Sequence, residues 1–162
     1  MKTLAIYPGS FDPITLGHLS VLRRATKVFE AITVVVVHNP KKSALLSADE
    51  RVDLIRDVLQ SEGLDSVSVS KLEGGLLVDF AKEIRADVIL KGFRTEADIE
   101  YELPMAQVNR DLTAIETIFF PSEPEFGYVS SSLVKEVAAL GGNVSSYVPA
   151  EVADVLRKRF TN

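Results

Sequence analysis

The stretch that decides the fold is LAIYPGSFDPITLGH, residues 4–18. Its apolar start, Leu4–Tyr7, predicts a buried β-strand. Gly9 and Gly17 permit close approach of the backbone, and the loop between them delivers the positive N-terminus of a helix to the carboxyl end of the strand. A strand, a glycine-containing loop and a helix in this order begin a βαβ unit.

Apolar strand-like runs alternate with helical patterns along the rest of the chain. Residues 33–37, Thr-Val-Val-Val-Val, form a continuous β-branched run that is typical of a central strand covered on both faces. The alternation predicts an α/β protein with a right-handed, parallel sheet of five strands and helices on both faces. The predicted strands are Leu4–Tyr7, Ile32–His38, Val67–Ser70, Val88–Lys91 and Ile115–Phe120. The predicted helices are His18–Phe29, Ala48–Glu62, Leu76–Arg85, Ala97–Arg110, Ser132–Leu140 and Pro149–Phe160.

Two signals fix the ends of the second predicted helix. Ser47 and Glu50 have the spacing of a capping box at its start. Gly63 stands where the helix should stop. No linker, repeat or low-complexity tract interrupts the pattern, so we predict one Rossmann-like domain over residues 1–162. Ligands of such sheets bind outside the carboxyl ends of the strands, where the strand order reverses.

Composition narrows the class of protein. The chain has 162 residues, of which 46% are hydrophobic and 25% charged, as in a globular protein. Its net charge of −5 argues against a nucleic-acid binder. It has no cysteine, which excludes disulfides, thiolate metal sites and a cysteine nucleophile. We find neither a signal peptide nor an apolar run of about 20 residues that would span a membrane, and we expect a cytoplasmic protein.

The first loop and the helical turn that follows it offer groups that bind an anion. Thr15 and His18 are three residues apart, so both side chains face one side of the first turn. Backbone amides, a hydroxyl and an imidazole therefore converge on one place. The alternative is an ordinary strand–helix turn in which His18 only caps the helix.

A lysine and an arginine follow the fourth predicted strand. Lys91 leaves an apolar strand run, and Gly92 then lets the chain turn so that Arg94 faces the same crevice. The alternative is a structural ion pair of Arg94 with Asp98 or Glu96.

Two other segments carry polar groups to the same edge of the sheet. Ser130–Ser132 come at the start of a helix, where they either cap it or hold phosphate groups together with the backbone amides. Lys41 and Lys42 follow the second strand, where they are either solvated or reach a bound anion. His38, which ends that strand, is assigned a structural role.

Residues 9–18 resemble the signature of the nucleotidyltransferase superfamily, in which Gly-Ser-Phe-Asp-Pro is followed by (His/Thr)-x-Gly-His. The resemblance extends over nearly the whole chain to the phosphopantetheine adenylyltransferase family. Sister nucleotidyltransferases, such as nicotinate-mononucleotide adenylyltransferases and cytidylyltransferases, typically carry histidine where Thr15 stands. The further segments that resemble this family, in the order of the family, are Lys91–Arg94, Asp98–Glu102, Asn109–Arg110 and Val129–Val137.

The resemblance implies roles for individual residues. It points to Lys42 rather than Lys41 as the residue that reaches the reacting phosphates. It assigns Lys91 to the acceptor phosphate, although many family members carry arginine there. The implied catalytic residues are His18, Lys42 and Arg94. The implied ATP-binding residues are Ser10, Phe11, His18, Gly92, Phe93, Arg94, Glu102, Phe126, Gly127, Tyr128, Val129, Ser130, Ser131 and Ser132. The implied acceptor-binding residues are Ser10, Lys42, Leu77, Lys91, Tyr101, Met105 and Asn109; without the family, the last three and Leu77 would be interpreted as ordinary core.

The reaction implied by the resemblance is ATP + 4′-phosphopantetheine → dephospho-coenzyme A + pyrophosphate. The acceptor phosphate is already anionic, so its direct attack on the α-phosphorus needs no general base. The sequence shows no metal-ligand cluster, and we expect Mg²⁺ to bind mainly through the ATP phosphates. The resemblance also implies a homohexamer and feedback inhibition by coenzyme A. A sister nucleotidyltransferase and a non-catalytic ATP-sensing domain remain as alternatives.

Overall fold

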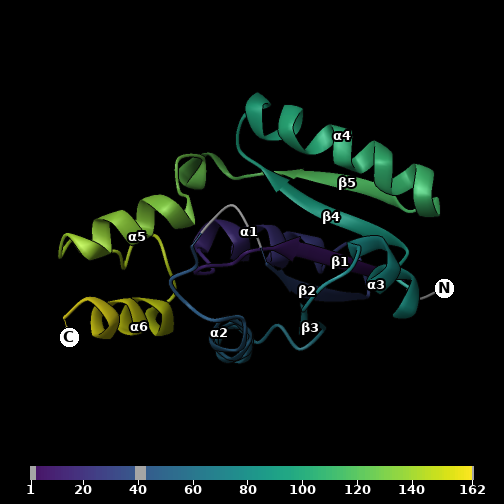
Figure 1. Cartoon of the computed structure of the whole chain (residues 1–162). Coiled ribbons are helices and arrows are strands. Elements are labelled where there is room, and N and C mark those ends of the chain that lie inside the picture. Colours follow the sequence, from purple (N-terminus) through teal and green to yellow (C-terminus); the bar gives the residue numbers. More distant parts are fainter. Residues whose placement is uncertain (1–2, 39–42, 162) are drawn as a thin grey trace.

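The computed structural model describes residues 3–38 and 43–161 (Figure 1). Strands and helices alternate along the chain as the sequence predicts, and they form a single α/β domain. The strands are β1 (Leu4–Gly9), β2 (Ala31–Val37), β3 (Val67–Leu72), β4 (Val88–Phe93) and β5 (Glu116–Pro121). The helices are α1 (Leu16–Ala25), α2 (Ala48–Ser61), α3 (Leu77–Glu83), α4 (Glu96–Thr113), the 3₁₀ turn η1 (Pro124–Phe126), α5 (Ser131–Ala139) and α6 (Ala150–Thr161).

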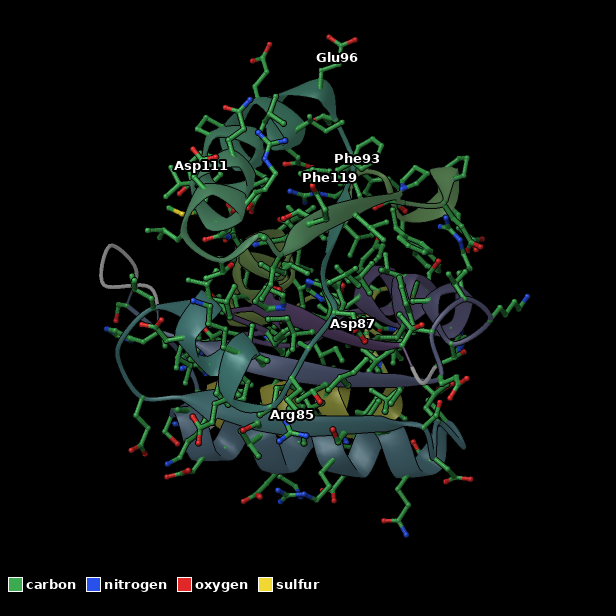
Figure 2. The ribbon with its side chains drawn as sticks, turned by 90° about the vertical axis from the view of Figure 1, so that its right-hand side faces the viewer. Arg85, Asp87, Phe93, Glu96, Asp111 and Phe119 are labelled. Atoms are coloured by element: carbon green, nitrogen blue, oxygen red, sulfur yellow. The ribbon has the colours of Figure 1, made fainter. Side chains whose placement is uncertain are left out.

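The five strands form one parallel sheet in the order β3-β2-β1-β4-β5. The β-branched run of β2 lies inside the sheet, between β1 and β3, as predicted. The Asp87 carboxylate just before β4 accepts a hydrogen bond of 2.8 Å from the Leu4 N–H, which joins β4 to the start of β1 (Figure 2). The order of the strands reverses between β1 and β4, so the crevice of this sheet lies at their carboxyl ends.

Helices cover both faces of the sheet. One face packs into a large apolar core with α1, α2, α5 and α6, in which Leu19, Val34 and Leu156 are among the buried side chains. The other face forms a smaller core around Ile6 and Val78. In Figure 1, α4 lies beyond β4 and β5 at the top of the molecule, and α2 lies below β2 at the bottom.

The helix ends follow from local capping. The Ser47–Glu50 capping box and the stop at Gly63, which has a φ of +64°, are confirmed. The prediction that the first helix spans His18–Phe29 was wrong at both ends, because Thr15 caps the helix three residues earlier and the chain leaves the helix after Ala25. In the described part of the chain, none of the helices is long and apolar enough to cross a membrane.

Candidate active site

A cavity of about 340 Å³ lies where the strand order reverses, at the carboxyl ends of β1 and β4. The N-termini of α1 and α5 reach the same cavity, so two partial positive charges are directed to it. The residues that line it are Tyr7, Pro8, Gly9, Ser10, Phe11, Thr15, Gly17, His18, Val21, Lys91, Gly92, Arg94, Asp98, Tyr101, Glu102, Ser122, Phe126, Val129, Ser130, Ser131 and Ser132.

The loop after β1 is tightly folded around an aromatic ring. Phe11 has a φ of +46°, which is a strained backbone conformation for an aromatic residue. A Cβ atom on Gly9 would lie only 2.9 Å from the Phe11 ring, so this position needs glycine. The Phe11 ring makes edge contacts with Tyr7 and His18 at centroid distances of 5.3 and 5.0 Å. The loop therefore holds the imidazole in place by aromatic packing.

The capping box of α1 determines which nitrogen of His18 carries a proton. The Thr15 backbone N–H donates to Nδ1 of His18 over 3.0 Å, so Nδ1 is an acceptor and the proton of a neutral ring is on Nε2. Burial and the nearby charge of Arg94 lower the pKa of His18 from 6.5 to about 4. His18 therefore caps the helix through Nδ1, and the cap leaves a neutral imidazole with a free Nε2–H donor.

The two predicted cations at the end of β4 are both paired with carboxylates. The Lys91 ammonium lies 3.0 Å from the Glu102 carboxylate. Arg94 pairs with Asp98 at 3.2 Å and also donates to the Val129 carbonyl over 3.2 Å. The ion pair with Asp98, which was one of the alternatives for Arg94, is therefore present, and Arg94 also lines the cavity as predicted.

The two carboxylates considered as partners of Arg94 are placed differently. Glu96, the other carboxylate offered as a partner for Arg94, points away from the molecule at the start of α4 (Figure 2). Burial alone would raise the pKa of Asp98, but its hydrogen bonds from Arg94 hold that pKa below its usual range. Asp98 is therefore a carboxylate that orients Arg94 at the edge of the cavity.

The serine triplet lies at the N-terminus of α5. Ser130 is the N-cap, because its hydroxyl accepts the Leu133 N–H over 3.1 Å, and the helix begins at Ser131 rather than at the predicted Ser132. The Ser131 hydroxyl donates to the Pro13 carbonyl over 2.7 Å, which ties this helix to the first loop. The serine triplet therefore caps α5 and also lines the cavity.

A buried ion pair supports the first loop from behind. The Asp12 carboxylate is 5% exposed and lies 2.7 Å from the Lys135 ammonium. It also accepts the backbone N–H groups of Leu45 and Leu46, each over 2.9 Å. Burial would raise the pKa of Asp12, but Lys135 and the two amides hold that pKa below its ordinary value. No local sequence pattern predicts this pair, since 123 residues separate its members.

The cavity gathers most, but not all, of the predicted site residues. Tyr101 and Met105 are 76% and 58% exposed, so the alternative of ordinary core does not hold for them, whereas Asn109 is buried. Leu77 packs against the smaller core. Lys42 lies outside the described residues. The predicted residues that line the cavity are Ser10, Phe11, His18, Lys91, Gly92, Arg94, Tyr101, Glu102, Phe126, Val129, Ser130, Ser131 and Ser132; those that do not are Leu77, Phe93, Met105, Asn109, Gly127 and Tyr128.

Several residues of the cavity were absent from the predicted site. Tyr7 and Pro8 lie just before Gly9, the last residue of β1, and Ser122 directly follows β5, so their places near the carboxyl ends of strands were the available signal. Asp98 was considered only as a partner of Arg94. Within residues 3–38 and 43–161, no group of three or more His, Cys, Asp or Glu residues could hold a metal ion.

Comparison with known proteins agrees with this fold. Residues 6–137 match the family of cytidylyltransferase-like proteins. Two solved structures share the fold at low sequence identity. One is nicotinic acid mononucleotide adenylyltransferase from Plasmodium falciparum, with a TM-score of 0.73, 16% identity and coverage of 98% of this chain and 96% of that one. The other is a bifunctional NMN adenylyltransferase/ADP ribose pyrophosphatase from Francisella tularensis, with a TM-score of 0.71, 16% identity and coverage of 100% of this chain and 50% of that one. The protein is therefore an enzyme of the nucleotidyltransferase class.

Relatives of high identity specify the family within that class. Phosphopantetheine adenylyltransferase of Clavibacter michiganensis is 51% identical over 160 residues, which cover 98% of each chain. Its counterpart in Caldanaerobacter subterraneus is 45% identical over 158 residues, which cover 97% of each chain. The chain belongs to the phosphopantetheine adenylyltransferase family.

Proposed function

We propose that this protein transfers the adenylyl group of ATP to 4′-phosphopantetheine, giving dephospho-coenzyme A and pyrophosphate, a step of coenzyme A synthesis. The observation that carries this proposal is the neutral, Nε2-protonated His18 in a cavity that also holds Lys91, Arg94 and two helix N-termini. Such an arrangement suits two phosphate-bearing substrates held together against their mutual repulsion. The identity of the acceptor is inferred from the relatives, which are named phosphopantetheine adenylyltransferases.

The transfer proceeds by direct in-line displacement. An oxygen of the acceptor phosphate attacks the α-phosphorus of ATP, the bond from the α-phosphorus to the bridging oxygen breaks, and pyrophosphate leaves with that electron pair. No proton must be removed from the nucleophile. The hydroxyl nearest to His18 belongs to Thr15, which is 2% exposed and accepts the His18 backbone N–H, so it is poorly suited to form a covalent intermediate.

The imidazole acts as a hydrogen-bond donor in this mechanism. Charge accumulates on the non-bridging oxygens of the α-phosphate as the pentacoordinate transition state forms. A neutral ring whose Nε2–H is fixed by capping and aromatic contacts stabilises that charge without rearranging. In the protein without ligands its low pKa leaves almost no protonated ring near neutral pH, which favours a neutral donor over a general acid.

The cations are assigned to different substrates. We propose that Lys91 binds the phosphate of phosphopantetheine and that Arg94 binds ATP, with Lys42 at the reacting phosphates. Lys91 presents a point charge rather than the bidentate fork of arginine. In the protein without ligands Glu102 neutralises Lys91, so an incoming phosphate competes with this carboxylate.

Magnesium is proposed as a partner of the nucleotide rather than as a resident ion. The carboxylates of the cavity, Asp98 and Glu102, are each engaged by a cation, which fits a metal held by phosphate and water oxygens. The metal would neutralise part of the charge of the triphosphate.

From the resemblance to phosphopantetheine adenylyltransferases, we also propose that the protein is a cytoplasmic homohexamer and that coenzyme A inhibits it.

A comparison of acceptors tests the proposal. The pure protein is incubated with ATP and magnesium and, in turn, with 4′-phosphopantetheine, nicotinate mononucleotide or no acceptor, and the products are identified by mass spectrometry. Dephospho-coenzyme A is expected from the first mixture alone. Dinucleotide formation from nicotinate mononucleotide would indicate a sister nucleotidyltransferase, and ATP binding without any product would indicate a nucleotide sensor.

A further inference from the structure

Arg51, near the start of α2, is a buried cation outside the main cavity. Its side chain is buried, with a residue exposure of 4%, and it lines the small cavity of about 50 Å³ behind the first loop. Within the described residues its guanidinium donates to backbone carbonyls alone: to Ser10 over 2.7 Å, to Val37 over 3.4 Å and to Ser47 over 3.3 Å. Arg51 therefore joins the loop after β1 to the end of β2 and to the start of α2.

The shortest of these bonds fixes one peptide group of the active-site loop. The Ser10 carbonyl and the Phe11 N–H belong to the same trans peptide, so they point in opposite directions. Since Arg51 holds the carbonyl on the side of α2, the Phe11 N–H points away from Arg51. Ser10 and Phe11 line the main cavity, whereas Arg51 does not.

Two further observations bear on this peptide. No hydrogen bond joins the Phe11 N–H to any other described residue. Phe11 has its strained φ of +46° directly after the peptide that Arg51 holds. A strained residue persists only where its surroundings fix it, and a charge-assisted bond to the preceding carbonyl is such a constraint.

We propose that Arg51 is a positioning residue: by holding the Ser10 carbonyl, it turns the Phe11 N–H into the cavity as a donor to a phosphate oxygen of ATP. Arg51 does not touch the substrate and acts through the Ser10–Phe11 peptide. The inference rests on the proposed function for its nucleotide, but its test with an ATP analogue needs no acceptor.

The test combines kinetics with a spectroscopic signal from the peptide itself. Arg51→Met removes the guanidinium and keeps an unbranched apolar chain. Since a misplacement of about 1 Å costs about 10²-fold in rate, kcat is expected to fall by about 10²-fold, with a smaller change in KM for the acceptor. In protein labelled with ¹⁵N at its 8 phenylalanines, the Phe11 amide is expected to shift when Mg²⁺ and α,β-methylene-ATP are added to wild type, and not in Arg51→Met. The Phe11 amide signal is identified as the one resonance that disappears from the spectrum of the labelled Phe11→Tyr variant.

Two variants complete the design. Arg159→Met removes a cation that pairs with Glu50, the neighbour of Arg51 on α2, and it should keep wild-type kcat and the Phe11 shift. Arg51→Lys covers the case in which Arg51→Met does not fold, because lysine keeps the charge but lacks the fork that reaches the Ser10 and Ser47 carbonyls at once. Its kcat and its Phe11 shift are expected to fall as well.

Each outcome decides the proposal. A reduced kcat together with a lost Phe11 shift supports it. Wild-type kcat in a folded Arg51 variant overturns it, as does a reduced kcat with the Phe11 shift retained, which would make Arg51 a stabilising residue only. A wild-type protein that makes no dephospho-coenzyme A would refute the proposed function, and the response of Phe11 to the ATP analogue would still test Arg51.

Discussion

His18 has two ring nitrogens with separate tasks, and two substitutions separate them. His18→Asn keeps an acceptor near the place of Nδ1, where the Thr15 N–H donates over 3.0 Å, but it has no group at Nε2. His18→Gln places an amide nitrogen near Nε2 and loses the acceptor at Nδ1. His18→Asn should therefore keep the helix cap and lose catalysis, whereas His18→Gln should lose the cap and keep catalysis.

The expected magnitudes follow from these two bonds. Loss of a preorganised donor to the transition state costs about 10²–10³ in kcat, or about 2.7–4 kcal/mol, so His18→Asn should lose that much. His18→Gln should keep kcat within about tenfold of wild type, and the loss of its cap should reduce the free energy of unfolding by about 0.5–2 kcal/mol. The KM for ATP should change little in His18→Asn, since the interaction forms chiefly in the transition state.

Steady-state kinetics with both substrates measure kcat and the KM for ATP of each variant, and urea unfolding of the same preparations measures its free energy of unfolding. Wild-type His18 is the reference, and His18→Ala, which lacks both groups, should show both losses. A folded His18→Asn protein with normal kcat would mean that the imidazole only caps α1. The assignment of His18 to the transition state would then be abandoned.

Three further predictions concern other groups. Lys91→Ala should weaken phosphopantetheine by about 10- to 150-fold, or about 1.5–3 kcal/mol, and ATP much less; calorimetric titration that finds equal losses would remove Lys91 from the acceptor site. Asp12→Ala leaves Lys135 without its partner and should lower the free energy of unfolding by about 3 kcal/mol in urea titrations, whereas an unchanged midpoint would show that the pair is not stabilising. The folded-state pKa of His18, about 4, lies below its ordinary 6.5, so the neutral ring favours the folded state and this stability is present above pH 6.5 and lost as the pH falls towards 4. Over that range wild type should lose unfolding free energy relative to His18→Asn, whose residue 18 does not titrate, and a difference between the two that stays constant would contradict the low pKa.

Local signals explain why much of the fold was predictable. The β-branched residues 33–37 gave β2, and the Ser47–Glu50 spacing gave the start of α2, because both depend only on near neighbours in the chain. Element ends were less certain where two residues compete for one role. Thr15 caps α1 ahead of His18, and Ser130 rather than Ser132 caps α5, and the choice depends on backbone angles that the sequence does not display.

The candidate site was predictable where strand ends carry polar residues, as at Lys91 and Arg94. Its supporting contacts were not, because they join distant segments. Arg51 meets Ser10 across 41 residues and Asp12 meets Lys135 across 123, and no periodic pattern links such positions. The protonation state of His18 also required the structure, since it depends on burial and on one hydrogen bond.

Direct transfer is the central claim, and the fate of the α-phosphate tests it most directly. The protein is incubated with [α-³²P]ATP, magnesium and 4′-phosphopantetheine, quenched by denaturation, and separated into protein, nucleotide and coenzyme fractions. We expect the label in dephospho-coenzyme A in an amount equal to the pyrophosphate released, with none on the protein. Label that stays on the denatured protein, or label that appears only as AMP, would contradict direct displacement by the acceptor phosphate.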